Sequence, residues 1–177
     1  LVRRILTETG ADLKQAAPWK AAGDAAPPSL GEALTEPTRI YVRPVMALAA
    51  AIDVHALAHI TGGGLPDNLA RVLPAGTRAV LRRGSWPEPP VFGWLQQAGG
   101  LSDVEMFRVF NMGIGMVAAV TPADAEPALA LLAAAGQPAW VIGTVEPASD
   151  EPQGRRLRFT PSAKRPTPGG WVEIVAD

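Results

Sequence analysis

The clearest candidate for chemistry is a run of glycines, Gly62, Gly63 and Gly64, that follows His59 and Thr61. The surrounding pattern predicts a strand before the run and a helix after it. Glycines in that position leave backbone N–H groups free to approach an anion, and the helix dipole adds positive charge. A phosphate group is the ligand that such a loop favours. The Lys-Ser/Thr pair of a Walker loop is missing, and the alternative is a tight turn that only needs positive φ angles.

His59 is the candidate catalytic side chain, because imidazole titrates near neutral pH and can move a proton beside a bound phosphate. His55 lies four residues earlier, a spacing that could suggest a metal site. However, no acidic residue lies between the two histidines as in the helical zinc motif, and the sequence has no cysteine. We therefore expect no metal ligands here.

Further candidates lie outside the glycine run. Asn111 and Gly113 open the segment Asn-Met-Gly-Ile-Gly, where small residues allow a ligand to approach the backbone, although a bulge beside packed methionines is the alternative. Arg39 would be a natural clamp for a phosphate beside the glycines, although a single exposed arginine is usually solvated surface. The five tryptophans are more typical of a core than of a ligand cage.

The composition indicates one globular domain. The chain has 177 residues, 47% of them apolar and 19% charged, and a net charge of -1. That balance argues against a nucleic-acid or membrane-surface protein, which needs a basic excess. The absence of cysteine excludes a disulfide framework, no apolar run approaches the length of a membrane span, and no charged start precedes an apolar signal segment. We expect a cytoplasmic protein. Because Leu1 opens directly into a helical pattern, the chain reads as a piece of a longer protein.

The elements that must position these residues alternate between strand and helix periods. This alternation predicts an α/β (α+β-like) fold, a layered domain with a mixed β-sheet packed by helices. Expected strands lie at 39–42, 54–61, 77–82, 113–120, 139–145 and 156–159, and expected helices at 1–6, 44–52, 66–73, 90–98, 102–107 and 121–135. Residues 16–37 form a loop-rich excursion with one possible helical turn at 30–34, and the domain is expected to end at residue 160, followed by a loose tail over 161–177.

Four segments occur together in the order and spacing of one enzyme family. They are residues 36–42 (Glu-Pro-Thr-Arg-Ile-Tyr-Val), residues 59–64, Asn68 with residues 71–74, and residues 111–115. With them, residues 1–159 resemble the C-terminal half of phosphoribosylformylglycinamidine cyclo-ligase, also called aminoimidazole ribonucleotide synthetase. The glycine run alone would also fit selenophosphate synthetase, thiamine-monophosphate kinase or formylglycinamidine ribonucleotide synthetase. The first and last segments favour the cyclo-ligase.

The resemblance implies a ligase of de novo purine biosynthesis. In that family ATP, with Mg²⁺, phosphorylates the formyl amide oxygen of formylglycinamidine ribonucleotide, and the amidine nitrogen then closes the imidazole ring of 5-aminoimidazole ribonucleotide. The resemblance also implies a homodimer formed through an N-terminal ATP-binding domain, which is absent from this chain and supplies most of the metal ligands. No nucleic acid or membrane is expected as a partner.

The site residues implied are His59 as the catalytic group and Thr61, Gly62, Gly63, Gly64, Asn68, Arg39, Asn111 and Gly113 for substrate or phosphate, with none for metal. We expect Gly63→Val to impair catalysis more than folding. We also expect the chain by itself not to turn over ATP. A catalytically silent binding domain with the same fold is the alternative function.

Overall fold

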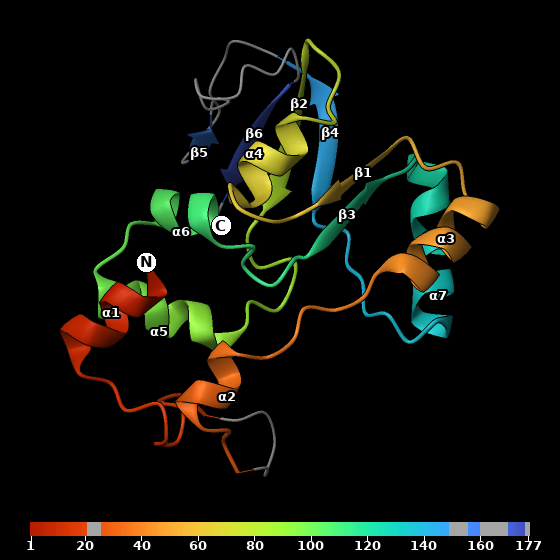
Figure 1. Cartoon of the computed structure of the whole chain (residues 1–177). Coiled ribbons are helices and arrows are strands. Elements are labelled where there is room, and N and C mark those ends of the chain that lie inside the picture. The colour runs from red at the N-terminus through yellow and green to blue at the C-terminus, as the bar shows by residue number, and fades with distance from the viewer. Residues whose placement is uncertain (21–25, 149–155, 160–169, 176–177) are drawn as a thin grey trace.

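A four-stranded sheet is the framework of the computed structural model, which describes residues 1–20, 26–148, 156–159 and 170–175 (Figure 1). Its strands lie in the order β4–β2–β6–β5, with bounds β2 Thr77–Arg82, β4 Gly143–Pro147, β5 Arg156–Phe159 and β6 Trp171–Val175. β2 and β6 run parallel, whereas β2–β4 and β5–β6 are antiparallel. The prediction of a mixed sheet is therefore confirmed.

A separate two-stranded ladder carries the predicted site. β1 (Ala56–His59) pairs antiparallel with β3 (Met116–Ala119), and His59 lies opposite Met116. Ala58 and Ile60 are buried while Leu57 and His59 are exposed, so the predicted alternation of faces is confirmed in this segment. The ladder thus presents His59 on its exposed face.

The helices surround these two sheets. Their bounds are α1 Val2–Thr9, α2 Leu30–Leu34, α3 Val42–Ala51, α4 Gly64–Ala70, α5 Pro90–Gly99, α6 Asp103–Val109 and α7 Ala125–Ala134, with a 3₁₀ turn η1 at Pro122–Asp124. α4 packs against α6 and β6, α1 against α5, and α3 against α7. In Figure 1, α3 and α7 lie beyond one end of the ladder, and α1, α2 and α5 lie on the other side of the molecule.

Local sequence signals set several helix ends. The predicted capping box of α6 is confirmed, since the Ser102 hydroxyl accepts from the Glu105 amide and the Glu105 carboxylate accepts from Ser102. The hydrogen bonds donated by the Ser102 amide and hydroxyl lower the pKa of Glu105. α5 ends at Gly99 and is capped by Gly100, whose φ of 59° suits glycine.

One hydrophobic core joins both sheets to α4 and α6. Its fully or nearly fully buried members include Leu65, Met106, Phe107, Val172 and Ile174. Trp86 also belongs to this core, as predicted for the tryptophans, whereas Trp140 is 40% exposed and does not fit that prediction. Because α4 and α6 share the core, the glycine loop that begins α4 lies close to the end of α6.

The strand predicted at residues 39–42 is wrong. Residues 39–41 are irregular and Val42 begins α3, with Pro44 as its third residue. Proline is tolerated in a first helical turn because the amides there have no intrahelical acceptor. The alternation over residues 39–42, which predicted a strand, is too short to outweigh the helix start that Pro44 indicates.

The loose tail predicted over residues 161–177 is wrong for residues 171–175. They form β6, an inner strand of the sheet, where Val172 is fully buried and Ile174 is 2% exposed. The apolar side chains of β6 pack into the core, which offsets the entropy of ordering the strand. Residues 160–169 and 176–177 lie outside the described residues.

Two smaller predictions also need correction. The helix predicted over 121–135 begins as the 3₁₀ turn η1 and continues as α7 from Ala125, and Thr121 donates to the Asp124 carboxylate at 2.6 Å. β4 begins at Gly143 rather than at residue 139. The excursion at 16–37 contains α2, and a bridge joins Ala16 to Ser29 directly before that helix, while residues 21–25 fall outside the described residues.

Candidate functional site

The glycine run forms the turn between β1 and α4. Gly63 and Gly64 have φ angles of 101° and 61°, which glycine adopts without strain. A Cβ on Gly63 would lie 2.7 Å from the Cβ of Asp67, and a Cβ on Gly64 would collide with the carbonyl oxygen of Phe107. The need for positive φ is therefore real at two of the three glycines. By contrast, Gly62 has open space around its Cα.

The same turn presents backbone donors that an anion could use. The Gly64 amide donates to the Thr61 carbonyl at 3.0 Å. The amides of Gly62 and Gly63 have no acceptor among the described residues. α4 has only seven residues, so its dipole adds little, and the donor set rests on these two amides.

Asn68 holds the loop from its inner side. The side chain is 5% exposed, and its Nδ2 donates to the Gly64 carbonyl at 2.7 Å and lies 3.3 Å from the Thr61 carbonyl. Its Oδ1 accepts from Arg71 Nη1 at 3.2 Å. The geometry gives Asn68 a role in shaping the loop, and its contact with a substrate stays a prediction.

His59 lies at the end of β1, directly before the loop, with its side chain exposed. The Tyr41 ring stands edge-on to the imidazole, with centroids 6.1 Å apart and an interplanar angle of 65°. The next amide, that of Ile60, donates to the Gly115 carbonyl at 2.9 Å. This bond joins the loop to the start of β3.

The segment with Asn111 and Gly113 is a tight turn that leads into β3. The Asn111 side chain accepts from the Gly113 amide at 3.0 Å, and buried Trp86 donates to the Met112 carbonyl at 2.9 Å. Met112 has a φ of 52°, which is uncommon outside glycine, and Gly113 has a φ of 96°. A Cβ on Gly113 would lie 2.5 Å from Cδ of Pro89. The segment lies beside the glycine loop, since the Ile60 amide donates to the Gly115 carbonyl, and the approach of a ligand to Asn111 or Gly113 stays a prediction.

Arg39 is exposed and makes no hydrogen bond or ion pair within the described ranges. The structure brings together His59, Thr61 to Gly64, Asn68 and the Asn111–Gly113 turn, whereas no hydrogen bond or ion pair among the described residues joins Arg39 to them. Its role as a phosphate clamp stays a prediction. The sequence prediction missed Tyr41 as a member of this cluster, although Tyr41 lies in the same segment as Arg39.

The residue types needed for a metal centre are not gathered in the part of the chain that the structure describes. That part contains no group of three or more His, Cys, Asp or Glu side chains able to hold an ion. His55 lies 3.5 Å from the Asp53 carboxylate, and both side chains are exposed. None of the described helices has the length and apolar character needed to cross a membrane.

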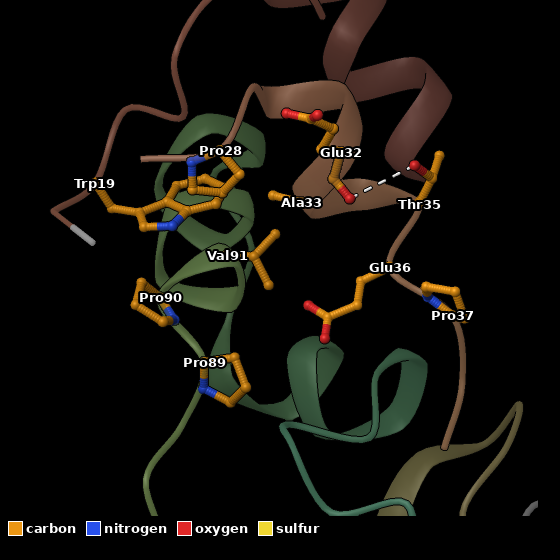
Figure 2. Close-up of a pocket in the computed structure, with 10 residues that line it drawn as sticks. All are labelled: Trp19, Pro28, Glu32, Ala33, Thr35, Glu36, Pro37, Pro89, Pro90 and Val91. Atoms are coloured by element: carbon orange, nitrogen blue, oxygen red, sulfur yellow. Dashed lines mark hydrogen bonds between the residues drawn. The ribbon is translucent and has the colours of Figure 1, made fainter. Parts of the chain in front are cut away.

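A groove of about 540 Å³ lies between α2 and the start of α5 (Figure 2). It is lined by Trp19, Pro28, Glu32, Ala33, Thr35, Glu36, Pro37, Pro89, Pro90 and Val91. Glu32 is held by Ser29 in the capping box of α2, and the resulting hydrogen bonds lower its pKa. None of the predicted site residues is among the described residues that line the groove, and Pro89 of its lining lies next to Gly113.

Comparisons with known proteins place this arrangement in a family. Residues 1–152 match the family model described as AIR synthase related protein, C-terminal domain. The chain is 51% identical over 131 residues to a phosphoribosylformylglycinamidine cyclo-ligase of Nitrosococcus oceani, covering 74% of this chain and 36% of the relative. It is 50% identical over 145 residues to that of Paraburkholderia phymatum, covering 82% and 39%. The chain thus spans less than two fifths of these relatives, and it belongs to the AIR synthase related proteins as their C-terminal domain.

Proposed function

We propose that this chain is the C-terminal domain of an ATP-dependent cyclo-ligase that closes the imidazole ring of 5-aminoimidazole ribonucleotide from formylglycinamidine ribonucleotide. The observation that carries the proposal is the identity of about 50% to relatives named as this cyclo-ligase. The meeting of the glycine loop, His59 and the Asn111–Gly113 turn around one ladder supports it further. The activity belongs to de novo purine biosynthesis. A cytoplasmic location is part of the proposal.

The described residues suit the binding and proton-transfer parts of this reaction. The amides of Gly62 and Gly63 would donate to a phosphate of the substrate or to the transferred phosphoryl group. The exposed imidazole of His59 would accept or donate a proton beside that phosphate. ATP supplies the phosphoryl group that activates the formyl oxygen. We assign ATP and Mg²⁺ mainly to the N-terminal part of the enzyme, because the described residues gather no metal ligands.

The exposed apolar surface around α3 is the proposed contact surface for the N-terminal domain of the same enzyme. Ile40 is 83% exposed, Val42 66% and Met46 65%, and Val42 and Met46 lie four residues apart on one side of α3. Large apolar side chains so exposed are typical of a surface that another domain covers. A homodimer formed through that N-terminal domain completes the proposed assembly.

The test is to fuse this chain behind the N-terminal part of the Nitrosococcus oceani cyclo-ligase. The fusion should form 5-aminoimidazole ribonucleotide from formylglycinamidine ribonucleotide only when ATP is present. His59→Ala should lower kcat/KM by about a hundredfold or more, with little change in thermal midpoint, because the side chain is exposed.

His55→Ala is the matched control, since His55 is also exposed and immediately precedes β1. It should leave kcat/KM near the wild-type value. A folded, assembled fusion that makes no product would instead favour the silent binding domain. Activity with selenide or with thiamine monophosphate, but not with formylglycinamidine ribonucleotide, would point to a related ATP-using synthetase or kinase.

A further inference from the structure

Tyr41 connects three separate segments of the candidate site. It is half-buried immediately before α3, and its ring stands edge-on to the imidazole of His59. Its hydroxyl oxygen lies against Gly115 so closely that a Cβ there would collide with it. The same Cβ would lie 2.9 Å from Cζ and 3.1 Å from Cε2 of the ring.

Contact with Tyr41, rather than backbone torsion, explains the glycine at residue 115. Gly115 is not among the residues with positive φ, so its backbone conformation is open to any amino acid. Its carbonyl accepts from the Ile60 amide, the residue after His59. Tyr41 therefore packs across the place where the end of β1 meets the start of β3.

We propose that Tyr41 is a positioning residue that holds the His59 imidazole in place over the ladder and that makes glycine necessary at residue 115. The aromatic ring of Tyr41, and not its hydroxyl group, positions His59, since the phenol oxygen makes no hydrogen bond to any described residue. An aromatic ring packed against an imidazole restricts the rotamers of that histidine, whereas an exposed histidine without such a neighbour is free to change rotamer. Where it concerns catalysis, this inference rests on the proposed function.

The first test measures the position of the imidazole without any reaction. His55 and His59 are the two histidines of the chain, so NMR resolves both sets of ring C–H signals. Tyr41→Ala should displace the His59 signals, because the ring current of Tyr41 is lost, and should leave those of His55 unchanged. Tyr41→Phe should keep the His59 signals near their wild-type positions. Unchanged His59 signals in folded Tyr41→Ala would overturn the proposal.

The second test measures the coupling between residues 41 and 115. Gly115→Ala should lower the thermal midpoint of the wild-type chain by roughly 5 °C, because the added methyl group overpacks the contact. The same change in the Tyr41→Ala background should cost less than half as much, since the colliding ring is gone. Equal losses in both backgrounds would show that Tyr41 is not the reason for the glycine.

The third test uses the active fusion and separates positioning from stability. Tyr41→Ala should lower kcat by about tenfold with little change in KM, since a misplaced catalytic group acts on the transition state. Tyr41→Phe should restore kcat to within about twofold, because it keeps the ring. If Tyr41→Phe is as slow as Tyr41→Ala, the hydroxyl and not the ring matters, and the proposal is wrong. If the wild-type fusion is inactive, the proposed function fails while the first two tests still decide the role of Tyr41.

Discussion

The carbonyl oxygen of Phe107 occupies the space into which a side chain on Gly64 would project. The carbonyl oxygen of Phe110 lies 2.8 Å from the same Cβ position. The start of α4 and the end of α6 therefore meet backbone against backbone, and no side chain can be inserted between them. This contact places the glycine loop next to the Asn111–Gly113 turn.

Gly64→Ala should destabilise the chain by about 2 kcal/mol or more, because alanine is strained at a φ of 61° and its methyl group meets a carbonyl that cannot move freely. Urea unfolding of the isolated chain measures the loss. Gly62→Ala is the matched control, and it should change the free energy of unfolding by less than about 0.5 kcal/mol. Equal losses in the two variants would contradict the packing described for α4 and α6.

Gly62→Val should lower kcat/KM of the fusion by about tenfold or more at an unchanged thermal midpoint, because a branched side chain beside the unpaired amides obstructs an anion. Gly62 replaces Gly63 as the position to test. A side chain on Gly63 meets Asp67 and strains a φ of 101°, so Gly63→Val should also destabilise the fold, and the expectation that it impairs catalysis more than folding stays a prediction. Gly93→Val, at another glycine with open space, is the control. Full activity of Gly62→Val would remove the loop from the site.

Asn68→Ala should cost about 1–3 kcal/mol of stability, since it removes the donor to the Gly64 carbonyl inside the loop. Asn68→Asp should cost more, because a carboxylate would face carbonyl oxygens at this position. Asn111→Ala, which removes an acceptor in a more exposed turn, should cost less than either. Thermal unfolding of the three variants gives the order. A stable Asn68→Ala variant with weakened substrate binding would return Asn68 to the group of direct ligands.

Asp103 should make stability depend on pH. The hydrogen bond from Gln96, at 2.8 Å, and then the bond and charge of Arg83, at 2.9 Å, lower the pKa of Asp103. A lowered pKa in the folded state means that this contribution is present above the unfolded pKa of about 3.9 and is lost as the pH falls through the folded pKa. Asp103→Asn should therefore be about 0.5–1 kcal/mol less stable at pH 7, discounted because the side chain is 45% exposed. Unfolding at pH 7 and at about pH 3 checks that the difference narrows on acidification. A constant difference would show that the ion pair adds nothing.

Local patterns predicted much of the fold, and long-range contacts account for what they missed. The capping box of α6 and the bounds of β2 follow from neighbouring residues, so the sequence predicted them correctly. The pairing of β2 with β6 depends on segments far apart in the chain. The segment 171–175 is apolar at every position except Glu173, but the prolines and glycines before it favoured a loose tail.

The sequence predicted where the site lies better than it predicted what each residue in the site does. The glycine loop lies between a strand and a helix as expected. The inward position of Asn68 depends on where three loop carbonyls point, which composition and spacing do not specify. The approach of Tyr41 to Gly115 depends on how α3 is joined to the ladder. Because residues 39–42 were predicted to form a strand, the sequence did not indicate this contact.

The parallel pairing of β2 with β6 has a consequence for synthesis of the protein on the ribosome. Arg78 pairs with Trp171, so about ninety further residues must be synthesised before the edge of β2 that faces β6 is paired. At translation rates of about 5–20 residues per second, that edge stays open for roughly 5–20 s. An apolar strand with unpaired backbone groups is then available to other nascent chains. The pairing of β2 with β6 can therefore be completed only after translation has passed residue 175.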